Sequence, residues 1–149
     1  MTVMLIALLK TVHVLSAALW VGGMFFTYVV LRPSMGVLEP AQRMLLQGQV
    51  LRRFFLVVWH AMPLVILTGY GMIHLYGGMA GVRWPVHAMM LIGLIMSAVF
   101  LWLFFGPYRV FRGASAPPVM VASLESIRKL VGVNLLLGLV SIILGFVPV

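Results

Sequence analysis

The sequence predicts an all-α integral membrane protein, a bundle of four transmembrane helices in up-down order. Of its 149 residues, 64% are hydrophobic and 8% are charged, and the mean hydropathy is +1.19, so too little polar surface exists to coat a soluble globule. Four apolar segments, at about 3–31, 53–76, 84–106 and 128–147, are each long enough to cross a bilayer as a helix. None of them alternates polar with apolar residues as barrel strands do. Residues 1–149 are therefore expected to form a single four-helix membrane domain.

The first apolar segment is expected to stay in the protein as a helix. It lacks a basic region before its apolar run and a small-residue cleavage pattern after it, and it contains His13 and Trp20. These features are untypical of a cleaved signal peptide.

The basic residues predict how the bundle is oriented. They cluster in the first and third connections, whereas the second connection carries only Arg83. The clustered residues are Arg32, Arg43, Arg52, Arg53, Arg109, Arg112, Arg128 and Lys129. The positive-inside rule then places both termini on the periplasmic side of a bacterial inner membrane. Because topology explains the net charge of +8, the bilayer is the expected partner and nucleic acid is not.

The connections contain two further local signals. The stretch RPSMGVLEPAQRMLLQGQVLRR, residues 32–53, mixes Leu and Met with Arg and Gln and predicts a short amphipathic helix on the inner leaflet. The turn GASAPP precedes VASLESIRK, where the fourth helix is expected to start, with Ser123 or Ser126 as its cap.

The side-chain inventory excludes several kinds of chemistry. Without cysteine, the chain has no disulfides, thiolate metal sites or thiol nucleophiles. Glu39 and Glu125 are the only acids and both lie in predicted connections. An intramembrane carboxylate relay is therefore not available.

Three histidines are predicted to share one depth near the outer face of the membrane. His13, His74 and His87 each lie about 20 residues from the arginine at the other end of their segment, which is roughly one hydrocarbon thickness. Each imidazole alone is consistent with packing or solvation. Three at one level, from three helices, predict a bound metal or haem with all three as candidate ligands.

Haem b is the cofactor that the three-histidine layer and its nearby cations favour. Lys10, His13 and Trp20 share one face of the first helix, and Lys10 and Arg83 are the outer-side cations expected to contact the haem propionates. His13 with either His74 or His87 would hold the iron. The expected activity is single-electron transfer, with a quinone or a periplasmic redox partner; the sequence leaves an enzymatic reaction and homo-oligomer formation open.

Copper is the alternative, because imidazole and thioether groups both bind it. Met72, Met89 and Met90 lie near the histidine layer and would join the same histidines in a copper transport protein. Methionine also fills cores, so a purely structural protein is the third hypothesis.

Two other polar features are expected to be mainly structural. His60 has no histidine partner at its depth, and Pro63 near it predicts a kink in the second helix. In the fourth helix, a stripe of small and polar residues predicts close helix packing. The stripe consists of Asn134, Gly138, Ser141 and Gly145.

Two motifs resemble known families. LKTVHVLSAALWVGGMFFTYVVLRP, residues 9–33, resembles the first helix of the copper-resistance D (CopD) membrane domain, and its K-x-x-H-x6-W pattern is also similar to the HemJ type of protoporphyrinogen oxidase. RWPVHAMMLIGLI, residues 83–95, resembles the second HemJ signature. The HemJ resemblance implies a four-helix bundle that binds haem b at His13 and His87, whereas the CopD resemblance implies copper uptake or tolerance. Met89 stands where the HemJ pattern has lysine, so porphyrinogen oxidation is not expected.

Overall fold

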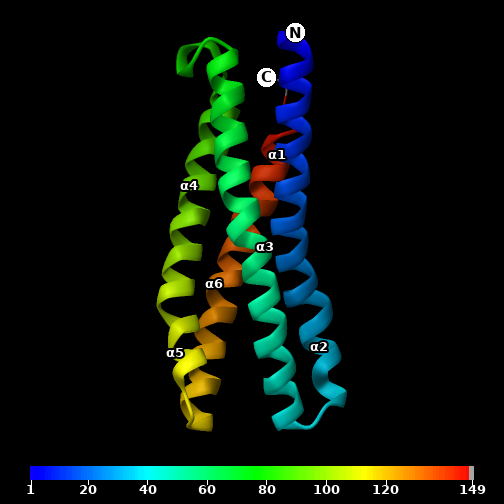
Figure 1. Ribbon diagram of the computed structural model, residues 1–149, viewed down its shortest axis with the longest axis vertical. Coiled ribbons are helices and arrows are strands. Elements are labelled where there is room, and N and C mark those ends of the chain that lie inside the picture. The colour runs from blue at the N-terminus through cyan, green and yellow to red at the C-terminus, as the bar shows by residue number, and fades with distance from the viewer. Residues whose placement is uncertain (148–149) are drawn as a thin grey trace.

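The computed structural model describes residues 1–147, which are mostly helical and contain no strand. The helical elements in chain order are α1 (Thr2–Phe25), a π-helix (Phe26–Leu31), α2 (Arg32–Ser34), a 3-10 turn (Met35–Val37), α3 (Pro40–Leu75), a 3-10 turn (Met79–Gly81), α4 (Trp84–Phe105), α5 (Pro107–Gly113) and α6 (Pro117–Leu144). They form an elongated up-down bundle (Figure 1).

Four stretches of continuous or nearly continuous helix are long and apolar enough to cross a membrane, which confirms the predicted class. These spans are Thr2–Val37, Pro40–Leu75, Trp84–Gly113 and Pro117–Leu144. Their outward faces carry many exposed large apolar side chains, as a lipid-facing surface requires. The protein is thus a multi-pass membrane protein.

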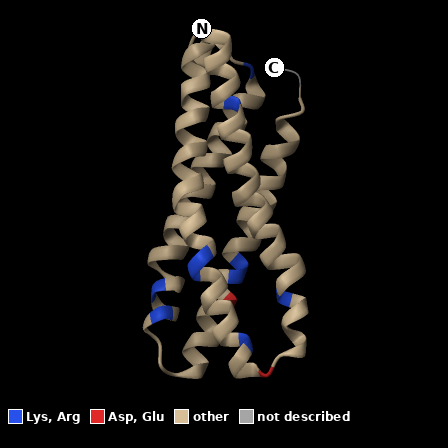
Figure 2. Ribbon diagram, turned by 45° about the vertical axis from the view of Figure 1, so that its right-hand side comes forward, with Lys and Arg blue, Asp and Glu red and all other residues tan. Residues whose placement is uncertain are grey.

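Charge divides the bundle into two ends. The N-terminus and the end of α6 lie at one end, which we call the terminal end (Figure 1). Lysine and arginine gather mainly at the opposite end, which we call the basic end (Figure 2).

The second span begins much earlier than the sequence pattern indicated, so the predicted surface helix within residues 32–53 is wrong. α3 starts at Pro40 and runs without a break, through Pro63, to Leu75. A capping box starts it: Glu39 and Gln42 satisfy each other's backbone N–H groups, and Pro40 occupies the first turn. Since Gly48 lies against the ring of Phe111, the amphipathic stretch packs as an extension of the span.

The fourth span also begins earlier than expected. α6 starts at Pro117 after the N-cap residue Ala116. Ser123 and Ser126 lie inside the helix, where their hydroxyls donate to the carbonyls of Val119 and Ala122. The prediction that either serine caps the helix is therefore wrong, because the two prolines of the GASAPP turn already favour the first helical turn.

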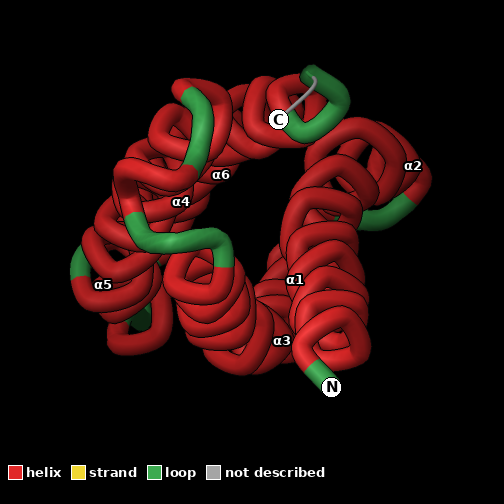
Figure 3. Tube along the Cα trace, turned by 90° about the horizontal axis from the view of Figure 1, so that it is seen from above, coloured by secondary structure: helices red, strands yellow, loops and turns green. Residues whose placement is uncertain are grey.

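Contacts between aromatic rings and between neighbouring helices hold the bundle together. α1 packs most extensively against α3 and also contacts α6, which packs against α4 (Figure 3). Toward the basic end, edge-to-face ring contacts join α3 to α4 and α5. The rings in this cluster are Phe54, Phe55, Trp59, Phe100, Phe104, Phe105 and Tyr108.

The stripe on α6 packs closely, as predicted. Asn134 donates from Nδ2 to the carbonyl of Met96 on α4 at 3.0 Å. A Cβ on Gly138 would lie 2.7 Å from Cγ2 of Val21 on α1, a distance that only glycine permits without a shift. The stripe therefore joins α6 to α4 and to α1.

Candidate functional site

His13 is the histidine most firmly built into the bundle. Its Nδ1 atom lies 3.0 Å from the carbonyl oxygen of Val65 and 3.1 Å from the hydroxyl of Thr68, both on α3. The Thr68 hydroxyl in turn donates to the carbonyl of Leu64, one turn earlier. The half-buried imidazole is thus held across the α1–α3 interface.

These contacts determine which ring nitrogen carries the proton. A carbonyl oxygen can only accept, so Nδ1 of His13 donates to Val65. Thr68 already directs its own hydrogen to Leu64 and can accept as well. A neutral imidazole protonated on Nδ1 has its lone pair on Nε2, the form in which metal-binding histidines are commonly held.

Glycine makes room for the imidazole. A Cβ on Gly69 would lie 3.2 Å from Cε1 of His13. Two residues farther along, a Cβ on Gly71 would lie 3.3 Å from Cδ1 of Leu9 on α1. The two helices therefore approach closely at His13 and at Leu9, one turn before it, and a larger residue at position 69 would displace the ring.

The other two predicted ligands lie around the α3–α4 hairpin. His87 donates from Nε2 to the carbonyl of Met79 at 3.0 Å, because a carbonyl can only accept. His74 is exposed in the last turn of α3. Within residues 1–147, no three His, Cys, Asp or Glu side chains form a group that could hold a metal ion. The expected shared three-histidine set is therefore not assembled.

The remaining predicted haem contacts differ in their surroundings. Lys10 and Arg83 are exposed near the terminal end, which leaves their proposed contacts with propionates a prediction. Trp20 is 2% exposed and belongs to the hydrophobic core.

The methionines near the histidine layer are only partly covered. Met72, Met89 and Met90 are half-buried, and Met89 lies near Gly145, the residue that caps the end of α6. Met72 follows Thr68 by one helical turn, on the α3 face that meets His13. Other methionines, including Met24, Met62 and Met96, are buried in the core as packing residues.

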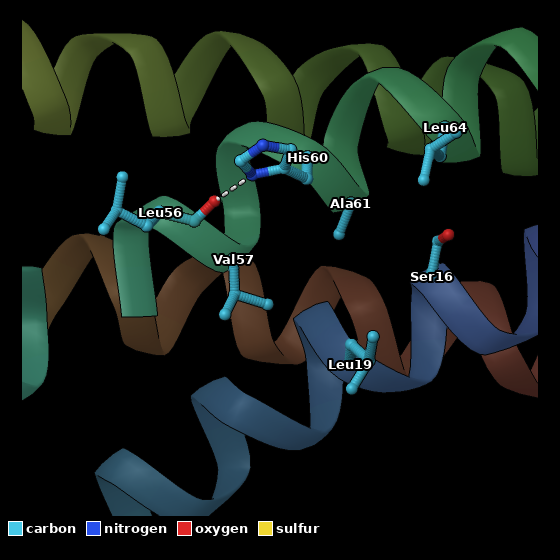
Figure 4. Close-up of a pocket in the computed structure, with 7 residues that line it drawn as sticks. All are labelled: Ser16, Leu19, Leu56, Val57, His60, Ala61 and Leu64. Carbon is cyan, nitrogen blue, oxygen red and sulfur yellow. Dashed lines mark hydrogen bonds between the residues drawn. The ribbon is translucent and has the colours of Figure 1, made fainter. Parts of the chain in front are cut away.

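His60 borders a groove between α1 and α3 (Figure 4). The groove has a volume of about 320 Å³, and its lining is almost entirely apolar. Its lining residues are Ser16, Leu19, Leu56, Val57, His60, Ala61 and Leu64. His60 donates from Nδ1 to the carbonyl of Leu56 on its own helix at 2.7 Å, which fits the expected structural role.

Sequence reasoning missed Val65, Thr68 and Gly69 as the surroundings of His13. A hydroxyl followed by glycine in an otherwise apolar helix was the available signal. Identifying Thr68 and Gly69 as neighbours of His13 would have required the register between α1 and α3, which no local pattern supplies.

Comparison with protein families gives one result. Residues 48–147, which comprise most of α3 and the structure that follows it, match the family model described as copper resistance protein D. No curated protein and no solved structure matches the chain. The match covers well over half of the chain and includes most of the second apolar span and all of the third and fourth, whereas the first span lies outside it. The chain belongs to the copper resistance protein D (CopD) family.

Proposed function

We propose that this protein binds copper as Cu(I) near its terminal end and serves copper transport or tolerance in a bacterial inner membrane. The observation that carries the proposal is the hydrogen bond from His13 Nδ1 to the carbonyl of Val65. Because Nδ1 holds the proton, the lone pair on Nε2 points away from this carbonyl and can bind a metal ion. Membership of the CopD family supplies the choice of copper.

The available donor types suit Cu(I). Thioether and neutral imidazole groups favour soft copper ions, whereas harder cations need carboxylates. The two acids, Glu39 and Glu125, both lie toward the basic end, far from His13. The metal-binding groups near the terminal end are thus the imidazoles of histidine and the thioethers of methionine.

Met72 is the second ligand that we propose. It lies one turn beyond Thr68 on the face of α3 that contacts His13. Thioether and imidazole from neighbouring helices would form a low-coordinate site for Cu(I). Rotation about the flexible methionine side chain would let the ion enter and leave.

Haem b and electron transfer gain no support from this geometry. If His87 were an axial ligand through Nε2, its bond to Met79 would have to break. Lys10, His13, His74 and His87 line neither the groove beside His60 nor the groove between α3 and α6 at the basic end. Copper is therefore the better-supported ligand. The positive-inside rule is the basis for placing the site on the periplasmic side of the membrane.

A copper titration of detergent-purified protein tests the proposal. Under reducing, anaerobic conditions a chromogenic Cu(I) chelator competes with the protein for the ion. We expect one Cu(I) per chain, with affinity at least about tenfold lower in His13→Ala and in Met72→Leu. His74→Ala, a matched change at an exposed histidine, should remain within about twofold of wild type.

A visible spectrum of the same preparations separates copper from haem. A Soret band that disappears in His13→Ala would overturn the copper assignment in favour of haem. Equal copper affinity in wild type and His13→Ala would remove His13 from the site. Cells producing the wild type, but not His13→Ala, should show altered growth in copper-containing medium.

A further inference from the structure

A second groove, distinct from the copper site, lies at the basic end. It is enclosed by the π-helix Phe26–Leu31, the first turns of α3 and the first half of α6, and its volume is about 330 Å³. Three arginines line it together with apolar side chains. Along the first span, the first residue that lines it, Thr27, follows His13 by 14 residues, or about 21 Å. The groove adjoins the arginine-rich end of the bundle (Figure 2).

The π-helix positions one wall of this groove. It inserts between α1 and α2, and the backbone N–H of Arg32 bonds to the carbonyl of Thr27, five residues earlier. Such a local change in helical register is frequent at functional sites. Here Thr27, Tyr28 and Leu31 line the groove.

Tyr28 is seated between two residues of α6. A Cβ on Gly132 would lie 3.3 Å from Cε2 of Tyr28, so glycine admits the ring. One turn earlier on α6, the guanidinium of Arg128 lies over the same ring, 5.9 Å from its centroid. Tyr28 is therefore packed tightly against α6, and its ring helps to orient the guanidinium of Arg128.

The groove has an excess of positive charge. Glu125 lies 3.2 Å from Arg128 and offsets one arginine. Arg43 donates to the carbonyls of Leu38 and Gly36, which orient the guanidinium without neutralising it. Arg32 adds a further positive charge to the same lining.

One donor in this lining lacks an acceptor. Among the described residues, Nε of Arg128 is buried and makes no hydrogen bond. A buried unsatisfied N–H on a charged group is costly. An anionic oxygen within the groove would offset the charge excess, and it would reach this donor once the Arg128 side chain turns, because Nε has almost no accessible surface.

We propose that this groove binds one anionic phospholipid. The phosphate would contact Arg32, Arg43 and Arg128, and an acyl chain would lie along Leu31, Val121 and Leu124. Basic pockets between membrane helices on the arginine-rich side suit acidic lipid headgroups. The apolar part of the lining favours a lipid over a free phosphate, which would leave that surface without a partner.

Native mass spectrometry of the detergent-solubilised protein, titrated with phosphatidylglycerol or phosphatidylcholine, tests the proposal. We expect one phosphatidylglycerol bound per chain, with clear preference over phosphatidylcholine. In the double variant Arg32→Gln/Arg43→Gln the affinity should fall about 25-fold, since each arginine near an anionic headgroup contributes about fivefold. The double variant Arg53→Gln/Arg109→Gln removes the same charge outside the groove and should stay within about twofold of wild type.

Two further arms make the outcome decisive. Val121→Trp fills the groove without changing charge and should lower phosphatidylglycerol binding about tenfold, even if the arginine double variant fails to fold. Inorganic phosphate at equal concentration should not displace the lipid. An equal loss in both double variants, equal binding of the two lipids, or displacement by phosphate would each overturn the proposal.

Discussion

Thr68 contributes to the site by holding another side chain. Its hydroxyl lies 3.1 Å from Nδ1 of His13 and donates to the carbonyl of Leu64, so it helps to fix the position of the imidazole, whose tautomer the Val65 carbonyl sets. The residue is buried at 6% exposure. A ring held in this way loses little freedom when a metal binds.

Thr68→Val is expected to weaken Cu(I) binding about tenfold, because it removes a group that orients a ligand while keeping the side-chain shape. The matched control is Thr11→Val, since the Thr11 hydroxyl bonds only to its own helix at the exposed carbonyl of Ala7. Chelator competition on both proteins measures the effect. Equal affinities in the two variants would contradict a positioning role for Thr68.

At the scale of single elements, helix length matters as much as side-chain contacts. α3 has 36 residues, or about 54 Å, whereas a bilayer's hydrocarbon core is about 30 Å thick. Its first turns therefore extend past the hydrocarbon at the basic end. There they form one wall of the groove that we assign to a phospholipid.

Gly138 on α6 offers a direct test of close helix packing. Gly138→Ala would place a Cβ 2.7 Å from Val21 and 3.3 Å from Met96, and such overpacking costs about 1–3 kcal/mol. Gly22→Ala on α1 meets no atom within 4 Å and should be neutral or slightly stabilising. The free energy of unfolding in mixed detergent should be lower for Gly138→Ala than for Gly22→Ala. Equal free energies of unfolding in the two variants would argue against this packing.

Asn134 supplies the polar link between α6 and α4. Asn134→Ala removes the bond to the carbonyl of Met96 and is expected to cost about 0.6–2 kcal/mol, the range for such bonds between membrane helices. Ser97→Ala is the control, because its hydroxyl bonds within α4 to Gly93. The same unfolding assay checks the difference, and equal stability of both variants would contradict the interhelical link.

For the whole molecule, the central property is the asymmetry between its ends. Basic side chains gather opposite the termini (Figure 2), and positive charge resists translocation. The copper site proposed at the terminal end would then face the periplasm, and the phospholipid groove would face the inner leaflet.

Cysteine labelling tests this orientation, because the chain has no cysteine of its own. Ala80→Cys lies in the hairpin between α3 and α4, and Ser115→Cys in the connection before α6. In intact cells, a membrane-impermeant maleimide should label Ala80→Cys but label Ser115→Cys only after lysis. The reverse pattern would invert the proposed topology.

The limits of sequence reasoning are clearest at the helix ends. Apolar runs predicted the membrane-embedded parts well, but α3 begins at Pro40 and α6 at Pro117, outside those runs. Hydropathy reports where lipid surrounds a helix, whereas capping and first-turn prolines decide where the helix starts. His13 was predicted as a site residue, but its partners Val65 and Thr68 were not.

The sequence by itself determined the membrane class, the number of spans and the charge asymmetry, because these depend on composition and on the length of apolar runs. Tertiary structure alone decided that His13 meets α3 while His87 meets its own hairpin, and that a π-helix opens a basic groove. The reason is that helix register and rotation follow from packing between segments distant in the sequence. Small residues such as Gly69 permit that packing, and the hydropathy of a single helix does not encode it.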